Sequence, residues 1–287
     1  MPCLHCRASR TDTDLNVRDV SQGVGWRNTC RPHDQRGVHE HPVWQIPGSS
    51  AFAYRGEWMH TAEEGVLLNL HASAMHDLLD GFYGGHSSFD LRVDELWNAL
   101  RRHFPRAADA PLRRLTSNML GGAHADFPTL GRCKASASKG LTTPMLHLLR
   151  EATDGSTAAL HRIRAYECLQ EIYRIIDMPG LFLPAASADA LWSCGNEFVQ
   201  HYAWLAQHNV QQGKYRYNPV FKMHWLLHLI WCARFLHPRA TWTYSFEDFC
   251  GRAKRLTIAG MHGSVNHNLA PEVLRQYLVA LHCVASW

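Results

Sequence analysis

The chain has 287 residues, of which 46% are hydrophobic and 19% are charged, and its 29 basic and 25 acidic side chains leave a net charge of +4. Disorder of the whole chain is excluded, because disorder needs low hydrophobicity and high net charge. The 20 glycines and 13 prolines are too few for a collagen-like sequence. The charge alone does not identify a nucleic-acid-binding protein, but the 20 histidines prompt a metal-binding hypothesis.

The first residues lack the apolar run of a secretory signal peptide. The most apolar stretch, 225–236, is interrupted by His228 and Arg234 and is shorter than the roughly 20 residues of a membrane span. Nine scattered cysteines, an odd number, do not form a secreted disulfide framework. We therefore expect an intracellular protein that has no membrane partner and keeps most thiols reduced.

Residues 1–56 contain many prolines and glycines and little hydrophobic periodicity, and only a few aromatic side chains such as Trp26 and Trp44. This pattern predicts a loop-rich N-terminal arm, with short strands at most, that packs on the rest of the chain or docks a protein partner. From residue 57 to 287 the pattern is helical, so we expect a helical domain over that range.

The N-terminal arm carries a candidate zinc site. Cys3-x-x-Cys6 places two thiolates at a spacing that suits one tetrahedral metal ion, and Cys30-x-x-His33 offers two more ligands. Structural zinc accepts such a Cys₃His set. The alternative is a reduced thiol pair that binds no metal.

The helical domain starts with Thr61-x-x-Glu64, a capping-box signature that predicts a helix from residue 61 to Asp80, ended by Gly81. A second helix carries its apolar stripe from Val93 to residue 104. Further helices are predicted over 112–120, 142–152, 156–176, 187–205, 220–236, 245–256 and 271–281, with a strand-like aromatic run at 241–244. The predicted fold is mainly α-helical.

His224 and His228 lie four residues apart on the most apolar predicted helix, so they share one face. The glutamate of a His-Glu-x-x-His zinc protease motif is missing, which favours buried structural histidines over metal ligands. Gly-x-Ser-x-Gly and a glycine-rich phosphate loop are also missing, so hydrolase and nucleotide-binding functions have no local support.

The helix predicted over 245–256 is acidic in its first turn, at Glu247 and Asp248, and basic later, at Arg252, Lys254 and Arg255. This charge order complements the helix dipole and needs no further function. The alternative is a metal-binding carboxylate beside a cationic surface for nucleic-acid phosphates.

Three groups of segments, in this order and spacing, resemble the C-terminal portion of CACTA (En/Spm-like) DNA transposases, and in particular the transposon-derived open reading frames of dinoflagellate algae. The first group is Cys3-x-x-Cys6-Arg-Ala, Val24-Gly-Trp26-Arg27, His41-Pro42 and Ile46-Pro47-Gly48. The second is Glu57-Trp58-Met59-His60 with Glu64-Gly65-Val66. The third is Lys222-Met-His224-Trp-Leu-Leu-His228, Phe235-Leu-His-Pro238-Arg239, Trp242-Thr-Tyr244 and Phe246-Glu247-Asp248-Phe249-Cys-Gly-x-x-Lys254-Arg-Leu256.

The resemblance implies a helical bundle-like insertion and the end of an RNase H-like core, in which three carboxylates bind two Mg²⁺ or Mn²⁺ ions. Glu247 matches the last of these carboxylates. Glu57-x-x-His60 matches a (Cys/Asp)-x-x-His motif, from which it departs at the first position. The family's first two aspartates precede the Cys-x-x-Cys segment, so the resemblance implies a catalytically incomplete fragment, associated with DNA in the nucleus, that does not cut DNA alone.

The sequence therefore leaves three functional hypotheses. The first is a transposase-derived protein that contacts DNA through Arg252, Lys254 and Arg255. The second is a zinc-stabilised helical binding or interaction module without enzymatic activity. The third is a helical interaction protein that docks its partner through residues 1–56.

Overall fold

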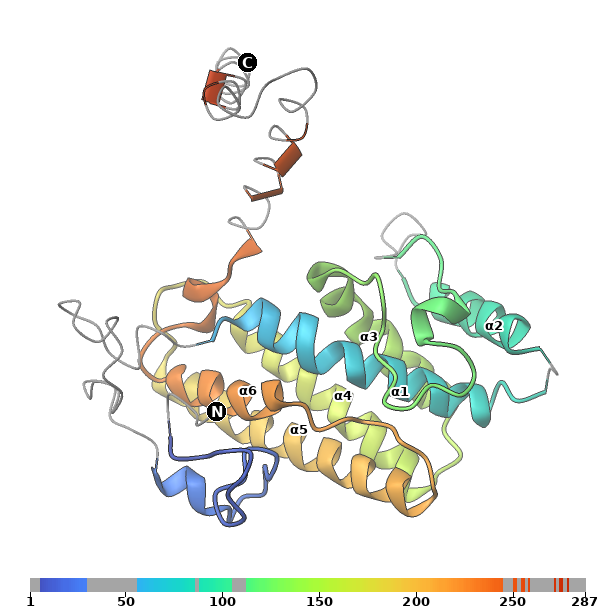
Figure 1. Cartoon of the computed structure of the whole chain (residues 1–287), viewed down its shortest axis with the longest axis horizontal. Coiled ribbons are helices and arrows are strands. Elements are labelled where there is room, and N and C mark those ends of the chain that lie inside the picture. The colour runs from blue at the N-terminus through green and yellow to red at the C-terminus, as the bar shows by residue number, and fades with distance from the viewer. Residues whose placement is uncertain are drawn as a thin grey trace. The chain divides into compact units, whose positions relative to one another are not determined.

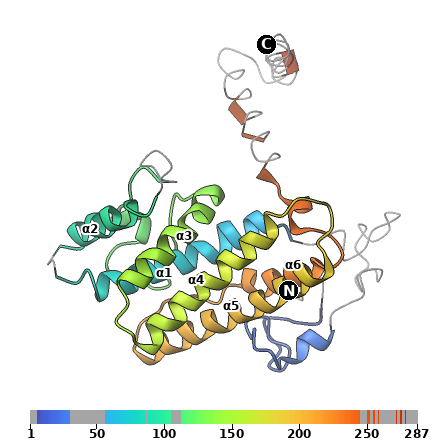
Figure 2. The same cartoon turned by 180° about the vertical axis from the view of Figure 1, so that it is seen from behind.

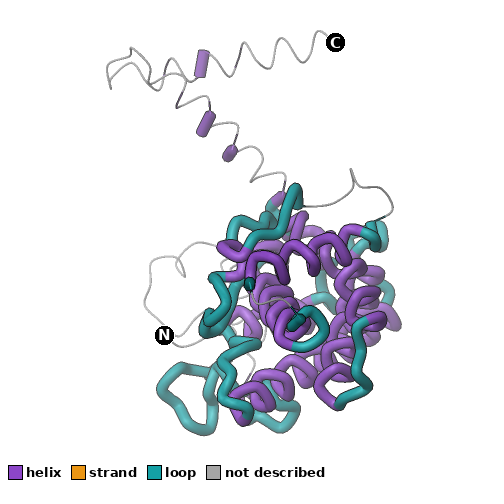
Figure 3. Tube along the Cα trace, turned by 90° about the vertical axis from the view of Figure 1, so that its right-hand side faces the viewer, coloured by secondary structure: helices purple, strands orange, loops and turns teal. Residues whose placement is uncertain are grey.

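The computed structural model describes residues 6–29, 56–85, 88–104 and 112–244, together with 250–251, 254–255, 258, 271, 274–275 and 278. The chain divides into two compact units, residues 1–241 and residues 242–287. Among the described residues, regular structure consists of helices, and Ser9 and Asn16 form the single isolated β-bridge (Figure 3). The predicted mainly α-helical fold is confirmed.

The first unit contains ten named helical elements in the described part of the chain, and α1 to α6 form its body (Figure 1). Three of the others are 3₁₀ helices and η3 is a π-helix. In chain order they are η1 (Gly25–Thr29), η3 (Met59–Val66), α1 (Leu67–Asp80), α2 (Phe89–Arg101), η5 (Ser117–Leu120), α3 (Ala135–Glu151), α4 (Thr157–Ile176), α5 (Ala185–Gln211), α6 (Phe221–Cys232) and η6 (Pro238–Thr241).

The first long helix does not begin at the predicted capping box. The helical backbone starts at Met59, and Thr61 is buried inside η3 rather than capping it. The first free amides are satisfied instead by Glu57, whose carboxylate accepts hydrogen bonds from the backbone N–H groups of Met59 and His60. The predicted end at Asp80, before Gly81, is confirmed.

Three other predicted segments differ from the structure. The helix predicted over 112–120 is reduced to the 3₁₀ helix η5 at Ser117–Leu120. α3 begins at Ala135, well before the predicted residue 142. Ala137, Leu141 and Met145 are buried at helical spacing, and this buried stripe continues past Pro144. Their packing outweighs the hydrogen bond that the proline removes. The strand predicted at 241–244 is also not formed. Thr241 is instead the last residue of the 3₁₀ helix η6, which contains a local hydrogen bond from the amide of Ala240 to the carbonyl of His237.

α4 and α5 run side by side as an antiparallel hairpin (Figures 1 and 2). α3 packs against α4, α1 packs against α3 and η3, and α6 packs against α5 and η3. α6 approaches α5 closely at Gly195, where a β-carbon would lie 2.4 Å from the Cδ1 atom of Ile230. The missing side chain therefore lets α6 lie directly on α5.

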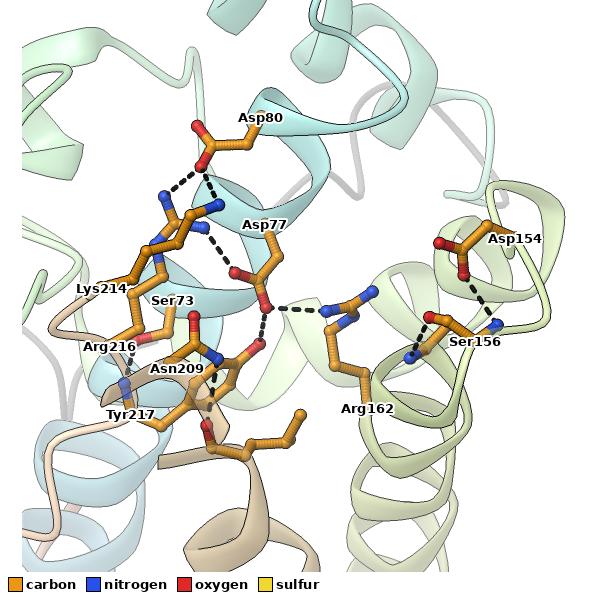
Figure 4. A network of polar contacts seen from close by, with 12 residues as sticks. Ser73, Asp77, Asp80, Asp154, Ser156, Arg162, Asn209, Lys214, Arg216 and Tyr217 are labelled. Carbon is orange, nitrogen blue, oxygen red and sulfur yellow. Dashed lines mark hydrogen bonds and ion pairs between the residues drawn. The ribbon is translucent and has the colours of Figure 1, made fainter. Parts of the chain in front are cut away.

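A buried ionic network fixes the segment that leads into α6 (Figure 4). The Asp77 carboxylate on α1 accepts hydrogen bonds from Arg162 on α4 at 2.8 Å, from Arg216 at 2.5 Å and from the Tyr217 hydroxyl at 2.6 Å. Because Arg216 also donates to Asp80 at 2.6 Å, the network joins α1, α4 and residues 214–217. It thereby positions the start of α6.

No helix among the described residues is long and apolar enough to cross a membrane.

Candidate metal centre

Residues 6–29, which we call the N-terminal segment, fold back on themselves through backbone hydrogen bonds. The amide of Ser9 donates to the carbonyl of Leu15 at 2.9 Å, and the amide of Val17 donates to the carbonyl of Ser9 at 3.0 Å. The segment consists mostly of loops, with η1 at its end. Within it, Cys6 and Trp26 are buried.

The N-terminal segment is anchored to α5 by an arginine. The Arg27 guanidinium donates to the side-chain oxygen of Asn196 at 2.6 Å and to the carbonyl of Val20 at 3.0 Å. It also lies over the Trp192 ring, 5.7 Å from the ring centroid. These contacts hold η1, and with it Trp26, close to the surface on which α6 packs.

α6 contributes two histidines from one face. His224 and His228 are four residues apart, and their exposed fractions are 0% and 5%. The Trp26 ring lies against both imidazoles, with ring-centroid distances of 4.2 Å and 5.5 Å. The indole therefore shields the pair from solvent on the side of the N-terminal segment.

Cys6 completes a cluster of three metal-binding side chains whose donor atoms all lie within 4.8 Å of one another. The Cys6 Sγ atom is 3.5 Å from the Nε2 atom of His224, and that nitrogen is 3.1 Å from the Nε2 atom of His228. For tetrahedral zinc, bond lengths of ~2.3 Å to sulfur and ~2.05 Å to nitrogen give about 3.6 Å between sulfur and nitrogen and about 3.3 Å between two nitrogens. The donors are therefore already close to chelating positions.

The chemistry of the donors also suits zinc. One thiolate and two neutral imidazoles form a mixed sulfur–nitrogen set that zinc prefers, whereas Mg²⁺ and Ca²⁺ require oxygen ligands. Three of the four positions of a tetrahedral ion are thus provided. The predicted ligands Cys3, Cys30 and His33 lie outside the described residues.

The chain matches no protein-family model, no curated protein and no solved structure. The metal centre therefore rests on the geometry of its own donors. The transposase hypothesis rests on the sequence segments that carry the resemblance.

The sequence identified Cys6 as a candidate ligand but did not join it to α6. The burial predicted for His224 and His228 is confirmed. Their contact with Cys6 was missed because 218 residues separate Cys6 from His224. A signal was present: a Cys-x-x-Cys pair and a His-x-x-x-His pair each supply half of a Cys₂His₂ set.

The other predicted site residues are not members of this cluster or lie outside the described residues. Glu57 and His60 are brought together, since the Glu57 carboxylate contacts both the backbone amide and the Nδ1 atom of His60 at the start of η3. Lys254 and Arg255 are exposed and helical in the second unit. Glu247 and Arg252 are outside the described residues.

Proposed function

We propose that this protein is a zinc-stabilised helical module in which one ion, held by Cys6, His224 and His228, fixes the N-terminal segment to α6. The observation that carries the proposal is the approach of three buried donors to tetrahedral ligand distances. The two sides of the centre come from opposite ends of the described first unit. Zinc would therefore clamp a loop-rich segment that has little regular structure of its own.

The surroundings favour a structural ion over a catalytic one. A catalytic zinc keeps one position open to water, whereas structural sites are closed. Here all three donors are buried, and Trp26 packs against both imidazoles. A closed centre of this kind would stabilise the fold rather than act on a substrate.

Metal analysis of the purified full-length chain tests the proposal. We expect about one zinc per chain in the wild type and loss of most of it in Cys6→Ser and His228→Gln. Cys168→Ser and His76→Gln, which alter a buried thiol and a buried imidazole away from the centre, are matched controls and should retain zinc. Replacement by Co²⁺ should give the visible absorption of a tetrahedral ion with a thiolate ligand. A wild-type chain that takes up no zinc, or full zinc in Cys6→Ser, would contradict the proposal.

The fourth ligand can be identified with the same assay. The sequence offers Cys3, at the Cys-x-x-Cys spacing, and Cys30 and His33 as candidates. The single variants Cys3→Ser, Cys30→Ser and His33→Gln should differ in zinc affinity. Only the variant that removes the true ligand should bind zinc much more weakly. If all three variants bind zinc as the wild type does, the fourth ligand is another side chain or water, and water there would contradict the closed structural site.

A second proposal, a transposase-derived protein that associates with DNA, is supported by the order of the resembling segments and by the exposure of Lys254 and Arg255. An RNase H-like core requires a β-sheet, and none forms among the described residues, so that part rests on the resemblance alone.

Binding to duplex DNA should weaken steeply with salt, and the double variant Lys254→Gln/Arg255→Gln should lower the salt slope by about two. Binding that does not depend on these residues, or none at low salt, would contradict it. DNA nicking dependent on Mg²⁺ or Mn²⁺ and abolished by Glu247→Ala would instead indicate an active enzyme.

A further inference from the structure

A second pair of histidines lies between α4 and α5, away from the metal centre. The antiparallel hairpin places His161, near the start of α4, beside His201 in the second half of α5. Their Nδ1 atoms are 2.8 Å apart, and both side chains are partly exposed. The pair is thus accessible to an ion from solvent.

The groups around this pair hold both rings in place. The Oε1 atom of Glu197, one turn before His201 on α5, is 3.5 Å from the Nε2 atom of His201. The His161 ring stacks on Trp204, with centroids 3.9 Å apart and planes 2° apart, and Trp204 stacks in turn on His208. Neither imidazole can turn freely away from the other.

We propose that His161 and His201 form a second metal site, which binds a late divalent transition-metal ion such as Zn²⁺, Ni²⁺ or Cu²⁺ through their two Nδ1 atoms, with water completing the coordination. Imidazole nitrogen is a good ligand for each of these ions. Two such nitrogens bound to one ion at ~2.1 Å lie about 3.0–3.4 Å apart, only slightly farther than in the pair. Bound there, the ion would link α4 to α5.

Glu197 supplies the arrangement that usually supports a metal-binding histidine. The Glu197 carboxylate, 3.5 Å from Nε2 of His201, favours a proton on that nitrogen. In this tautomer Nδ1 of His201 is the acceptor in its hydrogen bond with His161, so its lone pair points toward His161, and a metal ion would replace the shared proton.

Titration of the zinc-loaded full-length protein with Ni²⁺ tests this site. We expect the wild type to bind one Ni²⁺ beyond its zinc, and His161→Gln and His201→Gln each to weaken that binding by at least about tenfold. Glu197→Gln should weaken it by about tenfold, because losing a carboxylate behind a ligand typically costs that much. His208→Gln is the matched control: it alters the same aromatic stack without removing a ligand, so Ni²⁺ affinity should remain within about twofold.

Two additional readouts separate ligation from misfolding. Bound Cu²⁺ should show electron paramagnetic resonance couplings to two nitrogens in the wild type and to fewer in His161→Gln. The zinc content of each variant, measured in the same samples, reports the first centre independently. The proposal is overturned if the wild type binds no additional Ni²⁺, if His161→Gln and His201→Gln bind it unchanged, or if His208→Gln weakens it as much as they do.

Discussion

At the scale of single residues, the most unusual side chain is Glu63 in the π-helix η3. Its exposed fraction is 0%. Burial raises its pKa from 4.5 to about 8, although Lys139 and Tyr173 act in the opposite direction. The carboxyl group is therefore neutral in the folded protein at neutral pH, while in the unfolded chain it is ionised.

This difference predicts that the stability of the protein falls as pH rises. Between pH 4.5 and 8 the folded state holds a proton that the unfolded state has released, so the free energy of unfolding decreases across that range. Glu63→Gln removes this dependence. The stability of Glu63→Gln relative to the wild type should therefore rise by on the order of 4 kcal/mol between pH 4.5 and pH 8. Urea unfolding across this pH range measures the effect.

Glu64→Gln is the matched control, because it alters a neighbouring, more exposed carboxylate on the same helix. It should leave the slope of stability against pH almost unchanged. Equal slopes for the wild type and Glu63→Gln would show that the folded state does not hold the proton.

At the scale of helices, Asp77 connects elements that are far apart in the sequence. Its carboxylate and the Arg216 side chain are almost fully buried, and the Arg162 side chain, its other partner, is mostly buried (Figure 4). A buried ion pair adds little net stability, but removal of one partner leaves the others uncompensated. The network therefore makes the arrangement of α1, α4 and the segment before α6 dependent on one carboxylate.

We expect Asp77→Asn to destabilise the protein by about 3–5 kcal/mol, because Arg162 loses the carboxylate that it pairs with and Arg216 keeps only Asp80. The control is Asp94→Asn, which breaks a pair with Arg114 whose side chains are 41% and 64% exposed. That change should cost far less than Asp77→Asn, because solvent screens an exposed pair. Chemical denaturation measures both variants, and equal losses would contradict the assigned role of Asp77.

At the scale of the whole first unit, zinc would join its first described residue to its last α-helix. A ligand that binds only the folded state adds about 3–4 kcal/mol when its free concentration is 100–1,000 times the dissociation constant. Without the ion, the other contacts of the described part of the N-terminal segment, such as those of Arg27 with Asn196 and of Arg10 with the Phe221 ring, would have to hold it.

Chelation should therefore lower the melting temperature and make residues 6–29 sensitive to proteolysis, while the helices remain folded. Cys6→Ser should already show this sensitivity, and a chelator should change it no further. Acid should act like the chelator, since protons compete with the metal for imidazole and thiolate. Identical proteolysis of wild-type protein with and without a chelator would contradict a structural ion.

Much of the local structure could be predicted from the sequence because periodicity and capping act over a few residues. The Ser156 hydroxyl accepts a hydrogen bond from the amide of Ala159 and begins α4 as predicted. The prediction failed where a tertiary contact or a neighbouring side chain replaced the local signal. Glu57 took the capping role predicted for Thr61, and buried packing carried α3 through Pro144.

The sequence by itself was enough to predict a mainly α-helical fold, to single out Cys6 as a candidate metal ligand and to place His224 and His228 on one face of a helix. Only the tertiary structure decided that these three side chains meet, because a helix face does not reveal which distant segment will cover it. The close approach of α6 to α5 at Gly195 and the anchoring of Arg27 brought them together. The same holds for His161 and His201, which became neighbours only through the register of an antiparallel helix pair.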